Sequence, residues 1–160
     1  MSGLNYIVPI TGTSGPGVVA FPASAAVIMQ LTTSAACPIT INRIELQSGF
    51  TTSAQAVVSL QWGYYSTATS TNGFAATPTC LTKKAAAISS ATAAYGNTAT
   101  MGGTFAHRET WQWNLALPFD MVFGMDSLKI EVPAANVWAL IFPSSPGSVN
   151  ISGTIYYTEY

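Results

Sequence analysis

Alternation of apolar and polar side chains, with a period of two residues, is the feature of this sequence that most constrains its fold. Within residues 54–65, Val58, Leu60 and Trp62 fall on one face, while Ser59 and Gln61 fall on the other. Successive side chains of a β-strand point to opposite sides, so this pattern predicts a strand with one buried face. Strand patterns also cover residues 4–10, 25–32, 39–46, 105–117, 128–132, 137–142 and 149–157, and residues 121–123 are a further candidate. Because no long helical pattern separates these segments, we expect an all-β fold, an antiparallel sandwich or barrel of about eight strands.

Two of the predicted strands carry irregularities. In residues 39–46 the apolar positions change parity between Ile41 and Ile44, and a β-bulge near Asn42 and Arg43 would produce that change. In residues 105–117 the face that carries Phe105, Trp111 and Trp113 also carries His107 and Glu109. We therefore expect the early part of that strand to be exposed to water or to have polar partners.

Residues 66–104 do not fit the strand pattern. They are rich in Ser, Thr, Ala and Gly, and a structureless loop of that length is uncommon inside a compact domain. We predict an excursion that packs over the sandwich edge or onto a neighbouring molecule, with helix able to form only near residues 83–94. The rest of the sequence indicates a single domain over residues 1–160, with residues 1–24 as a candidate N-terminal arm.

The scarcity of charge limits what the chain can bind. Charged residues make up 7% of the sequence and hydrophobic residues 49%, with five basic and six acidic side chains. So few cations argue against nucleic-acid binding by phosphate neutralisation. An average soluble domain has about 25% charged residues, so this neutrality favours a subunit of a larger assembly.

Membrane insertion and secretion are not expected. The longest apolar stretch, residues 18–29, is broken by Pro22 and Ser24, and a membrane span needs roughly 20 continuous apolar residues. The N-terminus has no basic region ahead of an apolar stretch, so it does not match a secretory signal. Cys37 and Cys80 allow one disulfide but do not require one, and two reduced, buried thiols are the simpler interpretation.

No motif for catalysis is visible. The single histidine, His107, would have to serve any Ser-His-Asp triad, and the sequence contains no Gly-x-Ser-x-Gly turn. His107 and Glu109 could supply two metal ligands, but zinc sites need three or four. We interpret His107, Arg108 and Glu109 as a polar patch.

Paired carboxylates, as in glycosidases, are the other catalytic arrangement considered. Glu45, Glu109 and Glu131 lie in predicted strands, but the sequence alone does not pair them. We predict that the protein is not an enzyme, has no catalytic residues, and uses neither a metal nor another cofactor.

The segment Val137–Phe142 is apolar on both faces of its predicted strand. A sandwich strand has one face toward the core and the other normally toward water, so burying both faces requires a further layer. In a domain of this size we expect that layer to be another subunit, since aromatic residues are enriched in interface cores. The predicted interface residues are Val137, Trp138, Leu140, Phe142 and Tyr156.

The segment 43–50, the long Ser/Thr/Ala-rich stretch with its lysines, and the ending 153–159 together resemble small virion structural proteins of tailed bacteriophages. The resemblance extends loosely over residues 39–160. The nearest group is the capsid decoration, or cement, proteins, which have a jelly-roll, tumour-necrosis-factor-like sandwich. The resemblance implies no catalytic residues. It implies a homotrimer that is made in the host cytoplasm and then binds the major capsid protein on the virion surface.

Two other functions remain open. One is a receptor- or carbohydrate-binding head domain of a phage fibre, in which exposed Trp or Tyr rings would stack on sugars. The other is a jelly-roll subunit of the shell itself.

Overall fold

The computed structural model of the protein describes residues 3–10, 26–49, 57–66, 74–81, 87–97, 103–124, 128–144 and 149–160. Those residues form strands and no helix, as the alternation predicts. The strands are β1 (Leu4–Ile10), β2 (Ala26–Thr32), β3 (Ile39–Gly49), β4 (Val57–Tyr65), β5 (Phe74–Ala76), β6 (Thr79–Cys80), β7 (Thr92–Asn97), β8 (Phe105–Asn114), β9 (Phe119–Val122), β10 (Ile130–Val132), β11 (Val137–Phe142) and β12 (Asn150–Glu159).

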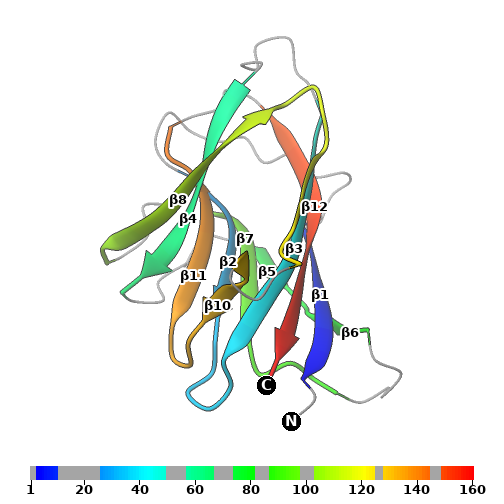
Figure 1. The fold of residues 1–160 in the computed structure, drawn as a ribbon, viewed down its shortest axis with the longest axis vertical. Coiled ribbons are helices and arrows are strands. Elements are labelled where there is room, and N and C mark those ends of the chain that lie inside the picture. Colours follow the sequence, from blue (N-terminus) through cyan, green and yellow to red (C-terminus); the bar gives the residue numbers. More distant parts are fainter. Residues whose placement is uncertain are drawn as a thin grey trace.

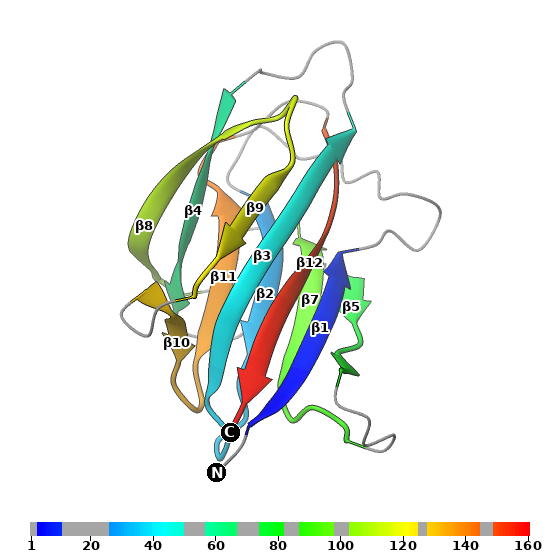
Figure 2. The ribbon, with the colours of Figure 1, turned by 45° about the vertical axis from the view of Figure 1, so that its right-hand side comes forward.

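The strands form two antiparallel sheets (Figure 1). The first sheet has the order β10-β3-β12-β1-β6, and β9 pairs with β3 beyond the end of β10. The second sheet has the order β5-β7-β2-β11-β4-β8. Figure 2 shows the first sheet in front of the second, with the two chain termini at the same end. The prediction of an all-β antiparallel sandwich is confirmed, and each of the predicted strand segments contains a strand.

One hydrophobic core lies between the two sheets. Its largest fully buried side chains include Trp138 and Phe142 from the second sheet and Tyr6 and Tyr157 from the first. The rings of Tyr6 and Tyr157, on neighbouring strands β1 and β12, stack with centroids 5.4 Å apart. Burial of these side chains holds the sheets together, since a fully buried large apolar side chain contributes about 1.5–3 kcal/mol.

The predicted bulge in β3 is confirmed. In the pairing of β3 with β12, Arg43 lies opposite Tyr156 and Ile41 lies opposite Tyr157, so Asn42 is the extra residue. The bulge lets Ile41 and Ile44 both face the core, where each is 0% exposed.

A second bulge, in β8, corrects one expectation. Trp62 of β4 lies opposite Glu109 and Gly63 lies opposite His107, so Arg108 is the extra residue. Phe105 and His107 therefore lie on the opposite face from Trp111, and the prediction that they share its face is wrong. Phe105 packs instead on a small apolar cluster outside the second sheet.

The excursion contributes strands to both sheets. β5 and β7 extend the second sheet beyond β2, whereas β6 pairs with β1 at the edge of the first. The described residues of this segment thus add strands to both sheets, which the sequence pattern there did not predict. Helix was possible only near residues 83–94, and residues 87–94 form none. Residues 83–86 lie outside the described residues, as do 54–56 and most of the candidate arm.

Candidate functional site: the outer face of the first sheet

Strand β11 does not present the interface expected from its sequence. Trp138, Leu140 and Phe142 point into the core and are 0% exposed within a single chain. Val137 and Ile141 point outward and are still only 4% exposed. The inference that a second subunit must cover this strand is therefore wrong.

The cover comes from within the chain. β11 is flanked on both sides, by β2 and β4, and Ala139 and Ile141 form a buried cluster outside the sheet. The aromatic rings of Tyr65 and Phe105, from β4 and β8, pack against this cluster and lie 4.9 Å apart. Side chains from neighbouring strands of the same sheet thus shield the second face of β11.

Tyr156 is the one predicted interface residue that lies on an open face. It lies on the outer side of β12, half-buried, opposite Arg43 of β3. Its hydroxyl donates a hydrogen bond to Oε2 of Glu45 at 2.8 Å. The guanidinium of Arg43 lies over its ring, 5.5 Å from the centroid, which is within the range of a cation–π contact.

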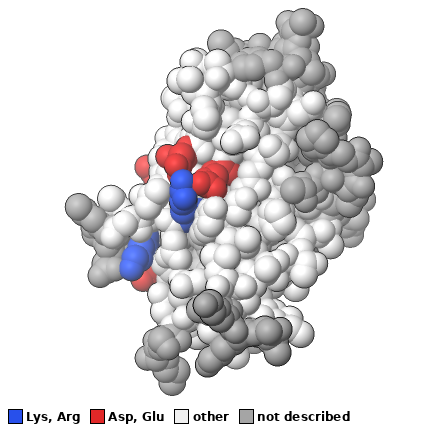
Figure 3. Space-filling view, turned by 90° about the vertical axis from the view of Figure 1, so that its right-hand side faces the viewer, with Lys and Arg blue, Asp and Glu red and all other residues white. Residues whose placement is uncertain are grey.

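Arg43, Glu45, Asp120 and Tyr156 together form what we call the Arg43 cluster. Arg43 Nε and Nη2 donate to the two carboxylate oxygens of Asp120 at 2.9 and 2.7 Å, and Nη2 lies 2.5 Å from Oε1 of Glu45. Strand geometry explains the grouping: Arg43 and Glu45 are two residues apart on β3, and Asp120 of β9 lies opposite Glu45. Figure 3 shows this red and blue group, with a second blue and red group below and to the left of it, among described residues that are otherwise mostly uncharged.

Hydrogen bonding shifts the pKa values within the cluster. The bidentate bond from Arg43 lowers the pKa of the Asp120 carboxyl and raises the pKa of the guanidinium. The bond to Glu45 raises the pKa of the Tyr156 hydroxyl, because it stabilises the protonated phenol. With Arg43 and both carboxylates ionised, the cluster carries one net negative charge.

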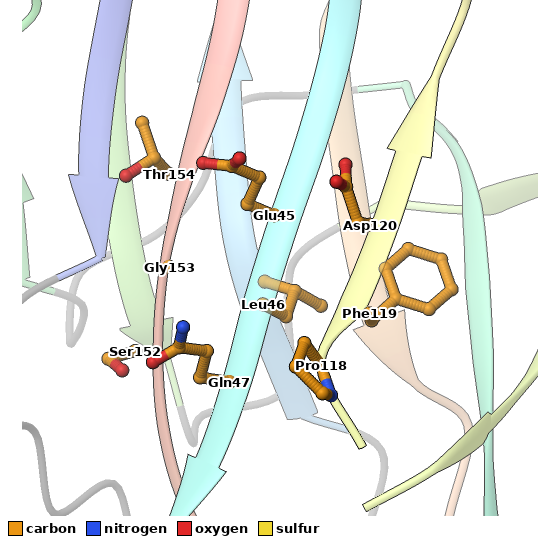
Figure 4. A pocket seen from close by; sticks show the side chains of 9 residues that line it. All are labelled: Glu45, Leu46, Gln47, Pro118, Phe119, Asp120, Ser152, Gly153 and Thr154. Carbon is orange, nitrogen blue, oxygen red and sulfur yellow. The ribbon is translucent and has the colours of Figure 1, made fainter.

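Two of the hollows on this face lie beside the cluster, one on each side of it. The first, which we call the Gln47 hollow, has a volume of about 470 Å³. Figure 4 shows Glu45, Gln47, Ser152 and Thr154 along one side of it and Pro118 and Asp120 along the other. The second, which we call the Val122 hollow, has a volume of about 380 Å³. Its lining includes Asn5, Asn42, Leu81, Val122 and Tyr156.

The Gln47 hollow follows from local sequence. Pairing between β3 and β9 stops at Leu46 and Phe119, because the residue before β9 is Pro118, which has no N–H to donate. On the other side, Gly153 lets β12 approach β3 closely, since a Cβ atom there would collide with the carbonyl oxygen of Glu45. Beyond Leu46, β3 therefore remains paired with β12 but is unpaired on the side of β9.

The candidate catalytic and metal-ligating residues are not brought together. The β8 bulge separates His107 from Glu109: Nε2 of His107 lies 2.9 Å from Thr110 Oγ1, and Glu109 accepts a bond from Trp62 Nε1 at 3.2 Å. Among the described residues, no group of three or more His, Cys, Asp and Glu side chains is placed to hold a metal ion.

The remaining candidates are also dispersed. Glu109 lies on β8 of the second sheet, and Glu131 of β10 lies opposite Thr40, five positions along β3 from Glu45, so the three carboxylates do not form a pair. No disulfide joins Cys37 and Cys80.

Sequence reasoning missed the Arg43 cluster. The spacing of Arg43 and Glu45 on one strand face was a usable signal for part of it. Asp120 is 77 residues from Arg43 in the sequence, so its role depends on the pairing of β3 with β9.

No protein-family model matches the chain, and no curated protein matches it significantly. None of the described elements is a helix that is long and apolar enough to cross a membrane. Function is therefore inferred from the residues and their geometry.

Proposed function

We propose that this chain is a non-enzymatic structural protein of a tailed bacteriophage: a capsid decoration protein that forms a homotrimer and binds the major capsid protein on the virion surface. The proposal begins from the sequence resemblance. Two features of the structure support it: the strand order and the character of the outer face of the first sheet.

The strand order supports a jelly roll. Along the chain, β1, β2, β3 and β4 alternate between the first and second sheets, and β8, β9, β11 and β12 alternate in the opposite order. Each sheet therefore interleaves strands from both halves of the chain. Two interleaved Greek keys of four strands each have this connectivity.

The exposed apolar rim of the Val122 hollow is the observation that carries the proposal. Val122 is 62% exposed and Leu81 is 53% exposed, on either side of Tyr156. Cores of protein interfaces are rich in aromatic residues and Arg and poor in unpaired charge. Here Tyr156 is the aromatic residue and Arg43 is the arginine, and the charge of Arg43 is already paired with Asp120 and Glu45.

A partner surface at this hollow explains how the protein would act. A protein that binds only the assembled shell lowers the free energy of that shell by RT ln(1 + [L]/Kd) at each site, about 2.7 kcal/mol at a hundredfold excess over Kd. Contacts that are mainly uncharged depend little on salt, so this stabilisation would persist across ionic strengths.

The competing fibre-head function receives less support. It relies on exposed Trp or Tyr rings for stacking on sugars. Trp111, Trp113 and Trp138 are at most 9% exposed, and among the described tyrosines only Tyr160 is largely exposed, at 50%. The fourth tryptophan, Trp62, is half-buried and its indole N–H is bonded to Glu109.

The test compares two valines of similar exposure on different surfaces. Val122→Asp places a charge in the Val122 hollow, and Val57→Asp places one at a position 51% exposed on the second sheet. Light scattering would measure the oligomeric state, and cosedimentation would measure binding to capsids that lack the protein. We expect the wild type to be a trimer that cosediments, Val122→Asp to lose at least about tenfold in trimer formation or capsid binding, and Val57→Asp to match the wild type.

A monomeric wild type that leaves capsids unbound would refute the proposal. Equal losses of trimer formation or capsid binding in the two variants would show that the Val122 hollow is not the binding surface. A shell subunit would be revealed by purified particles that fall apart when this protein is stripped from them.

A further inference from the structure

The Gln47 hollow contains polar groups that the fold does not use. Among the described residues, the side chains of Gln47, Ser152 and Thr154 have no hydrogen-bond partner, although all three line the same hollow (Figure 4). Ser152 lies opposite Gln47, and Thr154 lies opposite Glu45, in the pairing of β12 with β3. A hydroxyl pair and an amide therefore stand in register beside a carboxylate.

The carboxylates are held in place before any ligand arrives. Arg43 fixes both oxygens of Asp120 and one of Glu45, and Tyr156 fixes the other oxygen of Glu45. Each oxygen can accept more than one hydrogen bond, so both groups keep acceptor capacity toward the hollow. Preorganised groups bind more tightly because no side-chain freedom is lost on binding.

The lining favours one chemical class of ligand. Two carboxylates, one amide and two hydroxyls offer many acceptors and several donors, and the ring of exposed Pro118 offers apolar surface beside them. The cluster's net negative charge opposes phosphate and carboxylate ligands, and the pairing of both carboxylates with Arg43 weakens their attraction for a free amine. A molecule with many hydroxyls, a C–H face and no charge fits what remains.

We propose that the Gln47 hollow binds a neutral pyranose sugar of a surface glycan. Its volume of about 470 Å³ lies within the usual range of small-molecule sites. The sugar hydroxyls donate to Glu45 and Asp120 and exchange hydrogen bonds with Gln47, Ser152 and Thr154. This site does not use the tryptophan stacking expected of a fibre head, and it does not depend on the structural role proposed above.

The experiment uses the full chain and defined probes. An array of neutral and acidic oligosaccharides identifies candidates, and maltotriose, cellotriose and a hyaluronan tetrasaccharide are then titrated into ¹⁵N-labelled protein. We expect at least one neutral oligosaccharide to bind with a Kd of about 1 mM or tighter. Amide shifts should centre on Gln47, Ser152 and Thr154, and the acidic tetrasaccharide should bind at least about tenfold more weakly.

Matched variants separate binding from folding. Gln47→Ala and Thr154→Val should each weaken binding of the neutral sugar by about tenfold, which is the change expected when one hydrogen bond is lost. Gln112→Ala removes an exposed glutamine from β8 and should leave binding within about twofold. Leu81→Asp, which changes the Val122 hollow at a residue that does not lie on β3 or β9, should also leave sugar binding unchanged, which keeps this proposal separate from the capsid-binding test.

Three results would overturn the inference. The first is the absence of binding by every neutral oligosaccharide on the array. The second is a set of amide shifts centred elsewhere on the protein, or equal losses for Gln47→Ala and Gln112→Ala. The third is an acidic sugar that binds as tightly as the neutral ones, which would contradict the electrostatic argument.

Discussion

Two buried tryptophans offer a sharp test of the core, because their indole N–H groups differ in one respect. Trp138 is 0% exposed and Trp113 is 2% exposed, and both lie in the core between the sheets. Nε1 of Trp113 donates to the carbonyl oxygen of Leu117 at 2.8 Å. Nε1 of Trp138 has no hydrogen-bond partner among the described residues. Replacing each residue by Phe removes the same atoms, but only Trp113→Phe removes a hydrogen bond.

The expected magnitudes follow from that difference. Each substitution removes two buried ring carbons, at about 0.8 kcal/mol per carbon, and leaves a similar small cavity. Trp113→Phe also loses a hydrogen bond with a net value of about 1 kcal/mol, so it should destabilise by about 2–3 kcal/mol. Trp138→Phe relieves an unsatisfied buried donor that costs about 1–3 kcal/mol, so its net effect should be close to zero. We therefore expect the two variants to differ by about 2 kcal/mol or more.

Urea unfolding measures this difference directly, provided that the slope m is unchanged between the variants. Far-ultraviolet circular dichroism and tryptophan fluorescence should give coincident transitions, as two-state unfolding requires. If Trp138→Phe costs as much as Trp113→Phe, the Trp138 N–H is satisfied in solution and the reasoning fails.

Two further predictions concern ionised groups on the first sheet. Arg43 lowers the pKa of Asp120 below its ordinary value of 3.8. The ionised Asp120 therefore stabilises the folded state at neutral pH, and this stabilisation is lost as the pH falls below about 3.8. The urea midpoint of Asp120→Asn should consequently fall less than that of the wild type over the same acid range. Glu159 accepts bonds from the backbone N–H and hydroxyl of Ser90, which attaches residues 89–90 to β12. Glu159→Gln should therefore speed hydrogen exchange at the Ser90 amide and lower the free energy of unfolding by about 1 kcal/mol. The control Glu131→Gln should change neither quantity. Equal effects of the two variants would show that the attachment contributes little.

The sequence predicted the fold where apolar contrast was strong. The change of parity between Ile41 and Ile44 was visible because large aliphatic residues lie on both sides of the bulge. The bulge at Arg108 was not visible, because it lies in a run of polar residues that suit either face. β7 was missed for a related reason: apart from Tyr95, its residues are small or polar and show little alternation.

The candidate site was less predictable, because its parts are joined by strand pairing. The sequence contained Arg43 and Glu45 as neighbours on one face, but only the pairing of β3 with β9 and β12 adds Asp120 and Tyr156. The same limit explains the error at β11. Its pattern correctly predicted two buried faces, but a one-dimensional pattern does not show whether the cover comes from another subunit or from Tyr65 and Phe105 of the same chain.

The two outer faces of the sandwich differ in a way that bears on binding. Outside the second sheet, the apolar residues of β11 are already covered, so a partner would gain little by contacting them. Outside the first sheet, Val122 remains exposed and Gln47 and Thr154 remain without partners among the described residues. Removing apolar surface from water and completing hydrogen bonds both favour association. In the part of the chain that the structure describes, the first sheet thus presents an apolar contact and a polar contact that are separated by the Arg43 cluster.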